Sequence, residues 1–267
     1  MPSISFMTAN FVAREVGWTM PDWEAGDRSV NAAFSPIETY RERFGALLDE
    51  ARALGFDVID LWDAHLSAAW ATDAHLATAA DVLAERSMRV ASLAGWFGSD
   101  RAQFERHCLI AAAVGAPLLG GRTKLLDTDR DWMRAALERH GLRFGLENHP
   151  ERTPGEVLER IGPEADGLIG ATVDTGWFGT QGYDAAQAIE ELGERIVHVH
   201  LKDVAHAGEP HETCAYGDGV VPMNECVEAL RRLGYGGAIS IEHVPDDHDP
   251  RDEIRAAREQ LESWLPA

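Results

Sequence analysis

Residues 142–149 read Leu-Arg-Phe-Gly-Leu-Glu-Asn-His, a short apolar run that ends at the acidic residue Glu147. Three later runs have the same form and carry Asp174, His200 and Glu242 at or near their ends. The four polar residues are 27, 26 and 42 positions apart, and a (β/α)8 barrel advances by roughly 30 residues per strand–helix unit. We therefore predict that residues 142–147, 168–174, 196–201 and 238–243 are successive parallel strands of such a barrel.

The rest of the chain continues the alternation of strands and helices. Apolar runs predict the earlier strands at residues 4–7, 58–61, 88–93 and 117–119. Amphipathic stretches predict helices at residues 40–54, 74–86, 101–114, 130–140, 154–161, 184–192, 222–233 and 250–265. Ser35 is the predicted N-cap of the first of these helices, and Gly55 is its predicted end. Eight repeats favour a closed parallel sheet over an open doubly wound one, which typically has a glycine-rich turn after its first strand.

Composition favours one domain without a membrane segment. The chain has 267 residues, 45% of them hydrophobic, and no linker-like stretch divides it, so we expect a single barrel domain over residues 1–267. No apolar run reaches the ~20 residues that a membrane-spanning helix requires. Three cysteines without paired spacing, and an amino terminus without a signal-like run, indicate a cytoplasmic protein.

The excess of acidic over basic residues limits the classes of partner that the chain is expected to bind. Forty-five acidic and 24 basic residues give a formal net charge of −21 at pH 7. A charge of this sign and size repels nucleic-acid phosphates and anionic membrane surfaces. We therefore expect neither of these as a partner, and expect a small molecule instead.

Strand alternation assigns the polar residues to the barrel interior. Because successive side chains in a strand point to opposite faces, His198 and His200 point to the same side at two depths. His200 lies nearer the carboxyl end and is the predicted ligand, whereas His198 is predicted to be a buried, hydrogen-bonded core residue. Inward carboxylates at Glu147 and Glu242 are tolerated only when they are paired or bind a metal. Asp174 has an alternative role as the cap of a following helix.

Three carboxylates and one imidazole form a ligand set for a hard or borderline divalent cation. Glu147, Asp174, His200 and Glu242 are the predicted ligands of one ion, with Mn²⁺ as the first expectation and Mg²⁺, Co²⁺ or Zn²⁺ as alternatives. No cysteine lies among them, so selection of zinc by sulfur is not indicated. Such an ion can polarise a carbonyl and stabilise an enediolate while carboxylates on either side move the proton.

Five motifs in the carboxyl-terminal half carry a resemblance to a known family. They are Phe144–His149, Val173–Gly176, His198–Asp203, Gly217–Val221 and Gly234–His243. In this order they resemble the xylose-isomerase-like superfamily of sugar phosphate isomerases and epimerases, from about residue 60 to the end of the chain. The resemblance implies a TIM barrel and one divalent metal at the four predicted ligands. It also implies that the two glutamates among them carry protons through an enediolate of a keto-sugar or sugar derivative.

The chain departs from well-known members of that family. Ketose 3-epimerases have a substrate-contacting histidine where this chain has Trp177, and an arginine where it has His206. The AP endonucleases that bind three zinc ions need the same histidine and further histidines at the ends of strands two and three. Residues 92–97 supply none. A nuclease is therefore a minor alternative, and the acidic charge weighs against it.

Other residues are predicted to shape a substrate pocket. Trp62, Trp96 and Trp177 lie at or next to strand ends on the catalytic face, where an indole can stack on a sugar; packing beneath the loops is the alternative. His65 is placed to reach the substrate from the second loop, with a surface histidine as the alternative. Lys202 is the predicted cation for an oxyanion, again with a surface position as the alternative.

His149 separates two reaction types. Beside a metal-bound glutamate it can serve as a second base. The Glu-Asn-His run looks similar to that of relatives that cleave their substrates, namely inosose dehydratases and the 3-keto-C-glycoside deglycosidases that have a small partner subunit. We therefore predict a metal-dependent isomerase or epimerase first and a lyase second. A homo-oligomer or a small partner subunit is possible, and residues 204–221 are a candidate lid or oligomer contact.

Overall fold

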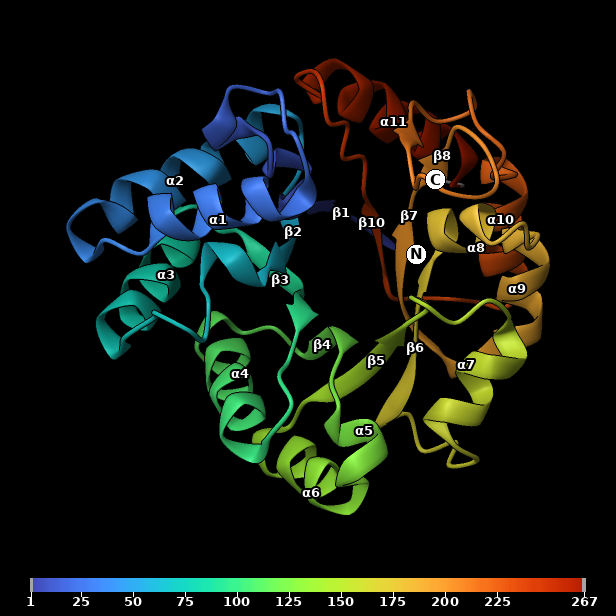
Figure 1. Cartoon of the computed structure of the whole chain (residues 1–267), viewed down its shortest axis with the longest axis horizontal. Coiled ribbons are helices and arrows are strands. Elements are labelled where there is room, and N and C mark those ends of the chain that lie inside the picture. The colour runs from blue at the N-terminus through green and yellow to red at the C-terminus, as the bar shows by residue number, and fades with distance from the viewer. Residues whose placement is uncertain (1, 266–267) are drawn as a thin grey trace.

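The computed structural model describes residues 2–265 and contains a closed barrel of eight parallel strands (Figure 1). Around the barrel the strands follow the order β1-β10-β7-β6-β5-β4-β3-β2, and β1 pairs with β10 to close it. The strands are β1 (Ser3–Met7), β2 (Val58–Trp62), β3 (Arg89–Trp96), β4 (Leu118–Arg122), β5 (Arg143–Glu147), β6 (Ile169–Asp174), β7 (Ile196–Leu201) and β10 (Ala238–Ile241). The predicted (β/α)8 TIM barrel is confirmed.

Helices surround the barrel and connect its strands (Figure 1). They are α1 (Trp23–Phe34), α2 (Ile37–Ala53), α3 (Asp73–Glu85), α4 (Arg101–Val114), α5 (Leu125–Thr128), α6 (Arg130–His140), α7 (Pro154–Ile161), α8 (Thr175–Thr180), α9 (Ala185–Leu192), α10 (Met223–Arg232) and α11 (Arg251–Trp264). Short 3-10 helices are η1 (Thr8–Phe11), η2 (Arg14–Val16), η3 (Asp63–His65) and η4 (Gly193–Arg195). All eight predicted helices are present within a few residues of their expected bounds, whereas α1, α5 and α8 were not predicted.

One predicted helix start is wrong. Ser35 is not the N-cap of α2, because it ends the preceding helix α1 and its hydroxyl donates to the Ala32 carbonyl at 3.4 Å. Helix α2 begins after Pro36 without a side-chain hydrogen bond at its cap. The predicted end is right: Gly55 follows the helix with a φ of 94°, in the left-handed region that glycine adopts most easily.

Helix α1 depends on close packing rather than on its composition. Asp22 caps its first turn by accepting a hydrogen bond from the Ala25 amide at 2.7 Å. Gly26 lowers the helix propensity of the segment. A Cβ at that position would lie 2.3 Å from Met20 Sδ and 2.7 Å from Val12 Cγ2, so a larger residue would push α1 away from the loop after β1. The glycine that weakens the helix signal in the sequence is therefore needed for the helix to pack.

The apolar core fills the space between strands and helices, while the strands also bury polar groups. Large side chains such as Tyr40, Phe44 and Phe104 are fully buried. The buried polar residues of the barrel strands include Ser5, Asp60, Ser92, Thr172, His198, His200 and Ser240. Within residues 2–265, no helix has the length and apolar character needed to cross a membrane.

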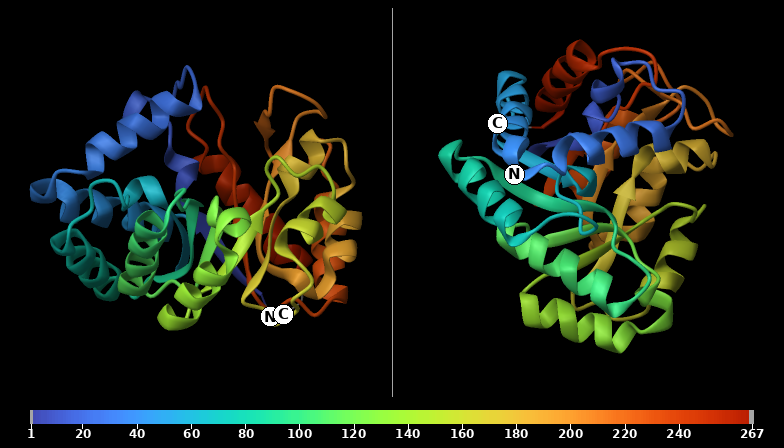
Figure 2. Two further views of the ribbon diagram at one scale, coloured as in Figure 1. Left: turned by 60° about the horizontal axis from the view of Figure 1, so that its bottom comes forward. Right: turned by 60° about the vertical axis from the view of Figure 1, so that its left-hand side comes forward.

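Two segments that are not part of the repeating strand–helix units project from one end of the barrel (Figure 2). One is helix α1, and the other is the antiparallel pair of β8 (Asp203–Val204) and β9 (Thr213–Cys214). The pair lies largely in residues 204–221, the lid segment, which was predicted as a lid or an oligomer contact. These additions stand at the end of the barrel that carries the predicted ligands, and they shape the cavity there.

Candidate metal centre and substrate cavity

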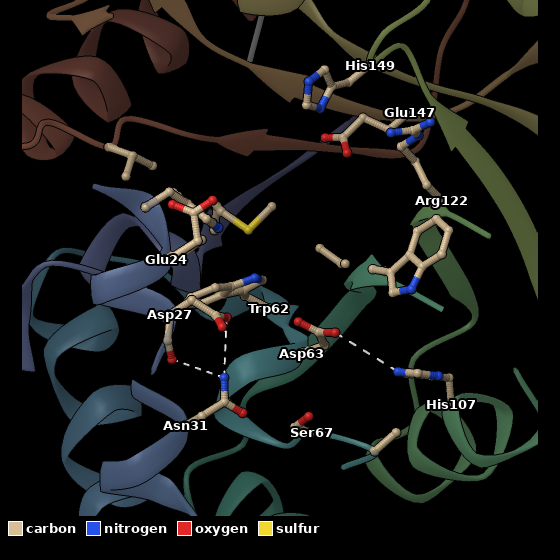
Figure 3. Close-up of a pocket in the computed structure, with 18 of the residues that line it drawn as sticks. Glu24, Asp27, Asn31, Trp62, Asp63, Ser67, His107, Arg122, Glu147 and His149 are labelled. Carbon is tan, nitrogen blue, oxygen red and sulfur yellow. Dashed lines mark hydrogen bonds and ion pairs between the residues drawn. The ribbon is translucent and has the colours of Figure 1, made fainter. Parts of the chain in front are cut away.

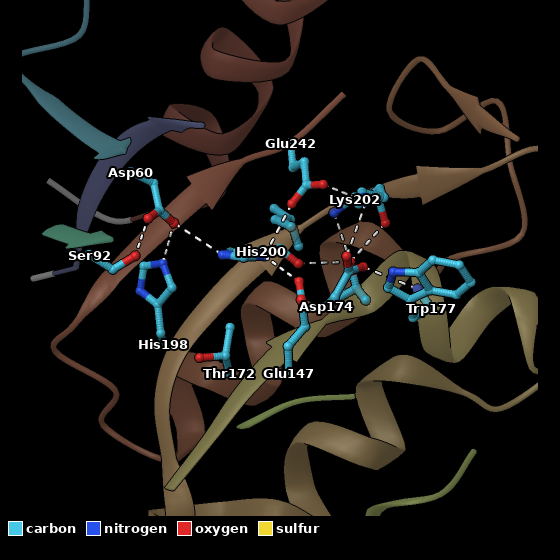
Figure 4. A network of polar contacts seen from close by, with 12 residues as sticks. Asp60, Ser92, Glu147, Thr172, Asp174, Trp177, His198, His200, Lys202 and Glu242 are labelled. Atoms are coloured by element: carbon cyan, nitrogen blue, oxygen red, sulfur yellow. Dashed lines mark hydrogen bonds and ion pairs between the residues drawn. The ribbon is translucent and has the colours of Figure 1, made fainter. Parts of the chain in front are cut away.

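Four acidic and imidazole side chains form one ligand cluster at the carboxyl end of the barrel (Figure 4): Glu147, Asp174, His200 and Glu242. One ligand atom from each lies within 4.8 Å of every other. Strand register explains the convergence, because Asp174 pairs with His200 across β6 and β7. His200 in turn pairs with Ser240 on β10, two residues before Glu242. The structure therefore brings together the four residues that were predicted to bind one ion.

Asp60 on β2 orients the imidazole of the cluster. Its Oδ2 lies 3.1 Å from His200 Nε2 and also contacts His198 Nε2. His200 Nδ1 faces the other way, 3.0 Å from Glu147 Oε1 and 3.1 Å from Glu242 Oε2. Because Asp60 accepts the proton of Nε2, Nδ1 is the nitrogen available to a metal. His198 is the buried, hydrogen-bonded residue that strand alternation predicted.

Lys202 is buried inside the ligand cluster. Its Nζ lies 2.5 Å from Glu242 Oε1 and 3.1 Å from Asp174 Oδ2. Only 5% of the residue is exposed, so the alternative of a surface lysine is wrong. A buried ammonium requires negative partners, and the two carboxylates supply them. The lysine therefore places a fixed positive charge beside the carboxylates of the ligand cluster, and its contact with a substrate oxygen stays a prediction.

The charges of the cluster depend on one another. Burial alone would lower the pKa of His200, but hydrogen bonds to the surrounding carboxylates raise it well above its usual value. Burial would raise the pKa of Glu242, but Lys202 and His200 hold it below its usual range. Burial raises the pKa of Asp174, and attraction to Lys202 offsets this only in part. The lysine and the imidazole thus balance the negative charge of the carboxylates.

The cluster fits a divalent cation. Asp174 Oδ2 and Glu242 Oε2 are buried and lack a hydrogen bond of good geometry, although Lys202 Nζ and His200 Nδ1 lie 3.1 Å from them. Buried polar atoms of this kind call for a further partner. Oxygen ligands with one imidazole suit Mn²⁺, Mg²⁺, Co²⁺ or Zn²⁺. The cluster is therefore a candidate site for one divalent ion, whose identity stays a prediction.

Asp174 has the geometry for both of its predicted roles. Its Oδ1 accepts a hydrogen bond from the Trp177 amide at 3.1 Å and caps α8. Its Oδ2 faces Lys202 and the ligand cluster. A cap role and a ligand role therefore use different oxygens of one carboxylate.

Two asparagines hold the backbone beside the ligands. The Asn148 amide bridges Asp174, accepting from its N–H at 2.7 Å and donating to its carbonyl at 2.9 Å. The Asn10 amide does the same on either side of residue 242, accepting from the His243 N–H at 2.8 Å and donating to the Ile241 carbonyl at 3.0 Å. Both are nearly fully buried. These bridges fix the backbone at the carboxyl ends of β6 and β10.

A cavity of about 1460 Å³ opens above the cluster and extends to helix α1 and the loops after β2 and β3 (Figure 3). Besides three of the predicted ligands, it is lined by five residues that were predicted at the catalytic face: Trp62, Trp96, His149, Trp177 and Lys202. Trp96 is 45% exposed and lies at the rim of the cavity, whereas Trp62 is only 6% exposed and forms part of its wall. Their contact with a substrate stays a prediction.

His65 does not reach the cavity, which contradicts its predicted contact with substrate. The residue is fully buried, and its ring packs edge-on against Phe34 and Trp62. Its Nδ1 lies 3.2 Å from Thr8 Oγ1. The cause is local, because the chain after β2 tightens into η3, and this turn directs the histidine back into the core.

Trp177 is stacked between two histidines at the wall of the cavity. The His149 ring lies 3.7 Å from it at an interplanar angle of 9°, and the His211 ring lies 3.8 Å from it at 14°. His211 Nδ1 is 2.7 Å from Thr180 Oγ1, and its Nε2 is buried without a hydrogen bond. Burial lowers the pKa of His149 and lowers that of His211 to about 3, so both rings are neutral at pH 7.

Asp203, the residue directly before the lid segment, anchors that segment by hydrogen bonds. Its Oδ2 accepts hydrogen bonds from the amides of Gly217 at 2.9 Å and Gly219 at 3.1 Å, and its Oδ1 accepts one from Val221 at 3.1 Å. A Cβ at Gly219 would lie 2.2 Å from a backbone oxygen, so only glycine fits there. The segment is therefore held closely at both ends, and its middle carries His211 to the cavity.

Three residues near the cavity were not among the predicted site residues: Asp60, Asp63 and His211. Asp60 had a usable signal, because an acidic residue inside an apolar strand run must find a partner. Asp63 sits directly after the same strand, and its position at the catalytic face is a weaker signal of the same kind. The sequence pattern could not place His211 at the cavity, because its location depends on the path of a long loop.

Comparison with known proteins agrees with this fold. Residues 48–266 match the profile of the family described as Xylose isomerase-like TIM barrel. An uncharacterized protein of Methanocaldococcus jannaschii is 32% identical over 136 residues, which cover 48% of this chain and 44% of that protein. A candidate hydroxypyruvate isomerase of Streptomyces coelicolor is 31% identical over 113 residues, covering 42% of this chain and 35% of that protein. The chain thus spans less than half the length of these curated relatives.

Among solved structures, a probable 3-DHS dehydratase from Bacillus anthracis superimposes with a TM-score of 0.67. The two chains are 16% identical, and the match covers 97% of this chain and 98% of that one. At this identity the likeness shows a shared fold.

Proposed function

The chain belongs to the family of xylose isomerase-like TIM barrels, and from this we propose that it is a divalent-metal-dependent sugar isomerase or epimerase. The proposed substrate is a keto-sugar or sugar derivative that reacts through an enediolate. One observation carries the proposal, namely the ligand cluster at the floor of a large cavity. When bound there, a divalent ion would supply positive charge to substrate oxygens that become negative during proton transfer.

Glu147 and Glu242 are the proposed proton carriers. They come from β5 and the end of β10, which lie three strands apart around the barrel, so they approach a bound substrate from different sides. One can take a proton from the carbon beside the carbonyl and the other can return a proton to the opposite face. Lys202, 2.5 Å from Glu242, keeps that carboxylate ionised and can donate a hydrogen bond to the substrate oxyanion.

The proposed substrate contacts are aromatic. Trp62, Trp96 and Trp177 line the cavity that opens above the ligand cluster, and indole faces pack well against the apolar faces of sugar rings. A small-molecule sugar is therefore the proposed partner of this site. Mn²⁺ as the resident ion, a cytoplasmic location, and a homo-oligomer or a small partner subunit stay predictions.

A lyase is the second candidate, and the position of His149 favours it. The residue lines the cavity two positions after Glu147 and is stacked on Trp177. Burial lowers its pKa, so at pH 7 it is a neutral base. From there it could remove a proton beside a ketone while a group on the next carbon departs with the electron pair, leaving an unsaturated ketone. Keto-glycosides and inososes are the matching substrates.

A substrate panel in D₂O tests both candidates. Ketoses, inososes and 3-keto-glycosides are incubated with the purified chain and Mn²⁺, and the products are followed by NMR. An isomerase gives an isomeric product with deuterium at the carbon beside the carbonyl, whereas a lyase gives an unsaturated product. The His200→Ala variant is the matched control for contaminating activity. Absence of both turnover and deuterium exchange across the panel would contradict the proposal.

A further inference from the structure

The cavity has a second arm, which contains none of the proposed metal ligands or proton carriers. It lies across the cavity from Glu147 and His149, between helices α1 and α4 (Figure 3). The residues that define the second arm are Asp27, Asn31, Trp62, Asp63, Trp70 and His107. The whole cavity, at about 1460 Å³, exceeds the roughly 1,000 Å³ at the upper end of small-molecule sites. A single sugar ring at the ligand cluster would leave much of this volume unoccupied.

Asp63 is a carboxylate without a cationic partner in the second arm. Among the described residues, no lysine or arginine forms an ion pair with it. Burial, and then repulsion from Asp27, raise its pKa to about 7. Gly95 makes room for the carboxylate, since a Cβ there would lie 2.6 Å from Asp63 Cγ. Above this pKa the arm therefore holds a negative charge that, among the described residues, no lysine or arginine neutralises.

His107 presents a second acceptor to the same space. Its Nδ1 lies 2.8 Å from the Gln103 carbonyl, and because a carbonyl only accepts, Nδ1 carries the ring proton. Burial lowers the pKa of His107, so the ring is neutral and Nε2 is an acceptor. The residue is 5% exposed, and Nε2 makes no hydrogen bond but lies 4.0 Å from Asp63 Oδ2 (Figure 3). When Asp63 is ionised, it and His107 are two acceptors that face each other, and they require a donor between them.

A protonated amine satisfies this pair better than a hydroxyl group does. An ammonium group has three N–H donors and a positive charge, so it can donate to both Asp63 and His107 and neutralise the carboxylate. Trp62 and Trp70 also line the arm, and indole faces attract cations. A hydroxyl group could donate to one acceptor only and would leave the charge of Asp63 unbalanced.

The two arginines that line this part of the cavity do not fill the role. Arg106 is engaged by Asp73, 3.6 Å away, and by the Ala71 carbonyl at 2.5 Å. Arg28 is exposed on α1, where its charge acts on the neighbouring Asp27. The position between Asp63 and His107 is therefore left to a ligand.

We propose that the second arm binds a primary ammonium group carried on a sugar-sized ring. The preferred ligands of the cavity are then amino sugars or aminocyclitols. That such a ligand is also the substrate rests on the proposed function, whereas the binding itself does not.

The test compares 6-amino-6-deoxy-D-glucose with D-glucose, which differ by one amine. Binding to the metal-loaded chain is measured by calorimetry and tryptophan fluorescence at pH 8, where Asp63 is ionised and the amine is protonated. We expect the amino sugar to bind at least about ten-fold more tightly, as one charge-assisted hydrogen bond would give. Equal affinities in the wild-type chain would overturn the proposal.

Single substitutions test which residues cause the preference for the amino sugar. Asp63→Asn should bring the affinity for the amino sugar to that for glucose, and Asp27→Asn should reduce the preference in part. Asp131→Asn, which removes the same charge from the exposed side of α6, should change nothing. A preference that survives Asp63→Asn would place the amine elsewhere and overturn the proposal. If Asp63→Asn does not fold, Asp27→Asn and the wild-type comparison still decide. Binding is read without turnover, so an inactive substrate panel would remove the proposed function and leave this result intact.

Discussion

Asp60 Oδ2 lies 3.1 Å from His200 Nε2 beneath the ligand cluster (Figure 4), and both residues are buried. The same oxygen also contacts His198. Burial alone would raise the pKa of Asp60, but the two imidazoles lower it below its usual range, so the carboxylate stays ionised. It thereby keeps the proton of His200 on Nε2 and leaves Nδ1 toward the carboxylates of the cluster. Asp60 thus orients His200, the imidazole ligand of the proposed metal site.

The first prediction is that Asp60→Asn weakens Mn²⁺ binding by about 10–100-fold, the usual effect of losing a carboxylate that orients a metal-binding histidine. The amide can no longer hold the same tautomer of His200. Calorimetric titration of the metal-free chain measures the change. Asp57→Asn, at an exposed position just before the same strand, is the control and should bind like wild type. An unchanged affinity in Asp60→Asn would remove the positioning role.

The second prediction concerns the ion itself. Metal analysis should find one divalent ion per chain, and a chelator should abolish turnover and lower the melting temperature. An ion at about 100 times its dissociation constant stabilises the folded chain by about 2.7 kcal/mol. His200→Ala is the control, because a chain without the imidazole ligand should bind little metal and respond weakly to the chelator. A protein free of stoichiometric metal whose activity survives chelation would contradict the metalloenzyme proposal.

The barrel could be predicted from the sequence because its signals are local. The runs around Glu147 and His200 are short, apolar and regularly spaced, so each identifies a strand without reference to the others. Helix α1 could not be predicted in this way. Gly26 reduces its helix propensity, and only the contacts with Met20 and Val12 in the folded chain explain why that glycine is there. Tertiary packing, rather than local helix propensity, therefore accounts for helix α1.

The site residues also fall into two groups, those that local signals predict and those that only the folded chain places. Inward carboxylates such as Glu242 could be predicted, because a buried charge must be compensated wherever a strand carries it. His65 and His211 could not be placed, because neither the tight turn after β2 nor the path of the long loop after β7 follows from the residue pattern. A tight 3-10 turn carries His65 into the core, and hydrogen bonds to Asp203 anchor the loop that brings His211 to Trp177.

The third prediction distinguishes the two reaction types at His149. In a lyase that uses this residue as the base, His149→Ala should abolish elimination while metal occupancy stays near that of wild type. In an isomerase that uses two glutamates, the same change should raise KM far more than it lowers kcat. His206→Ala, on the lid segment, is the control. Unchanged kinetics would assign His149 to packing against Trp177.

The fourth prediction is that Asp203→Ala lowers the free energy of unfolding by about 2–4 kcal/mol. The carboxylate accepts hydrogen bonds from four amides of the lid segment, those of Val204, Gly217, Gly219 and Val221, and its loss leaves these donors without their partner. Urea denaturation measures the change. Asp218→Ala, exposed in the same segment, should change stability by less than about 0.5 kcal/mol. Similar effects from both variants would mean that Asp203 does not anchor the lid segment.

The last prediction concerns Glu242 as a proton carrier. Glu242→Gln keeps the shape of the side chain but removes its capacity to accept a proton, so turnover of a true substrate should fall by more than about 10²-fold. Deuterium uptake from D₂O beside the carbonyl should fall with it, because the same residue moves that proton. The change also removes a predicted ligand oxygen and a partner of Lys202, so metal occupancy must be measured in the same sample. Glu212→Gln, exposed on the lid segment, provides the matched control. A Glu242→Gln variant that retained both metal and full turnover would show that proton transfer does not use this carboxylate, whichever sugar proved to be the substrate.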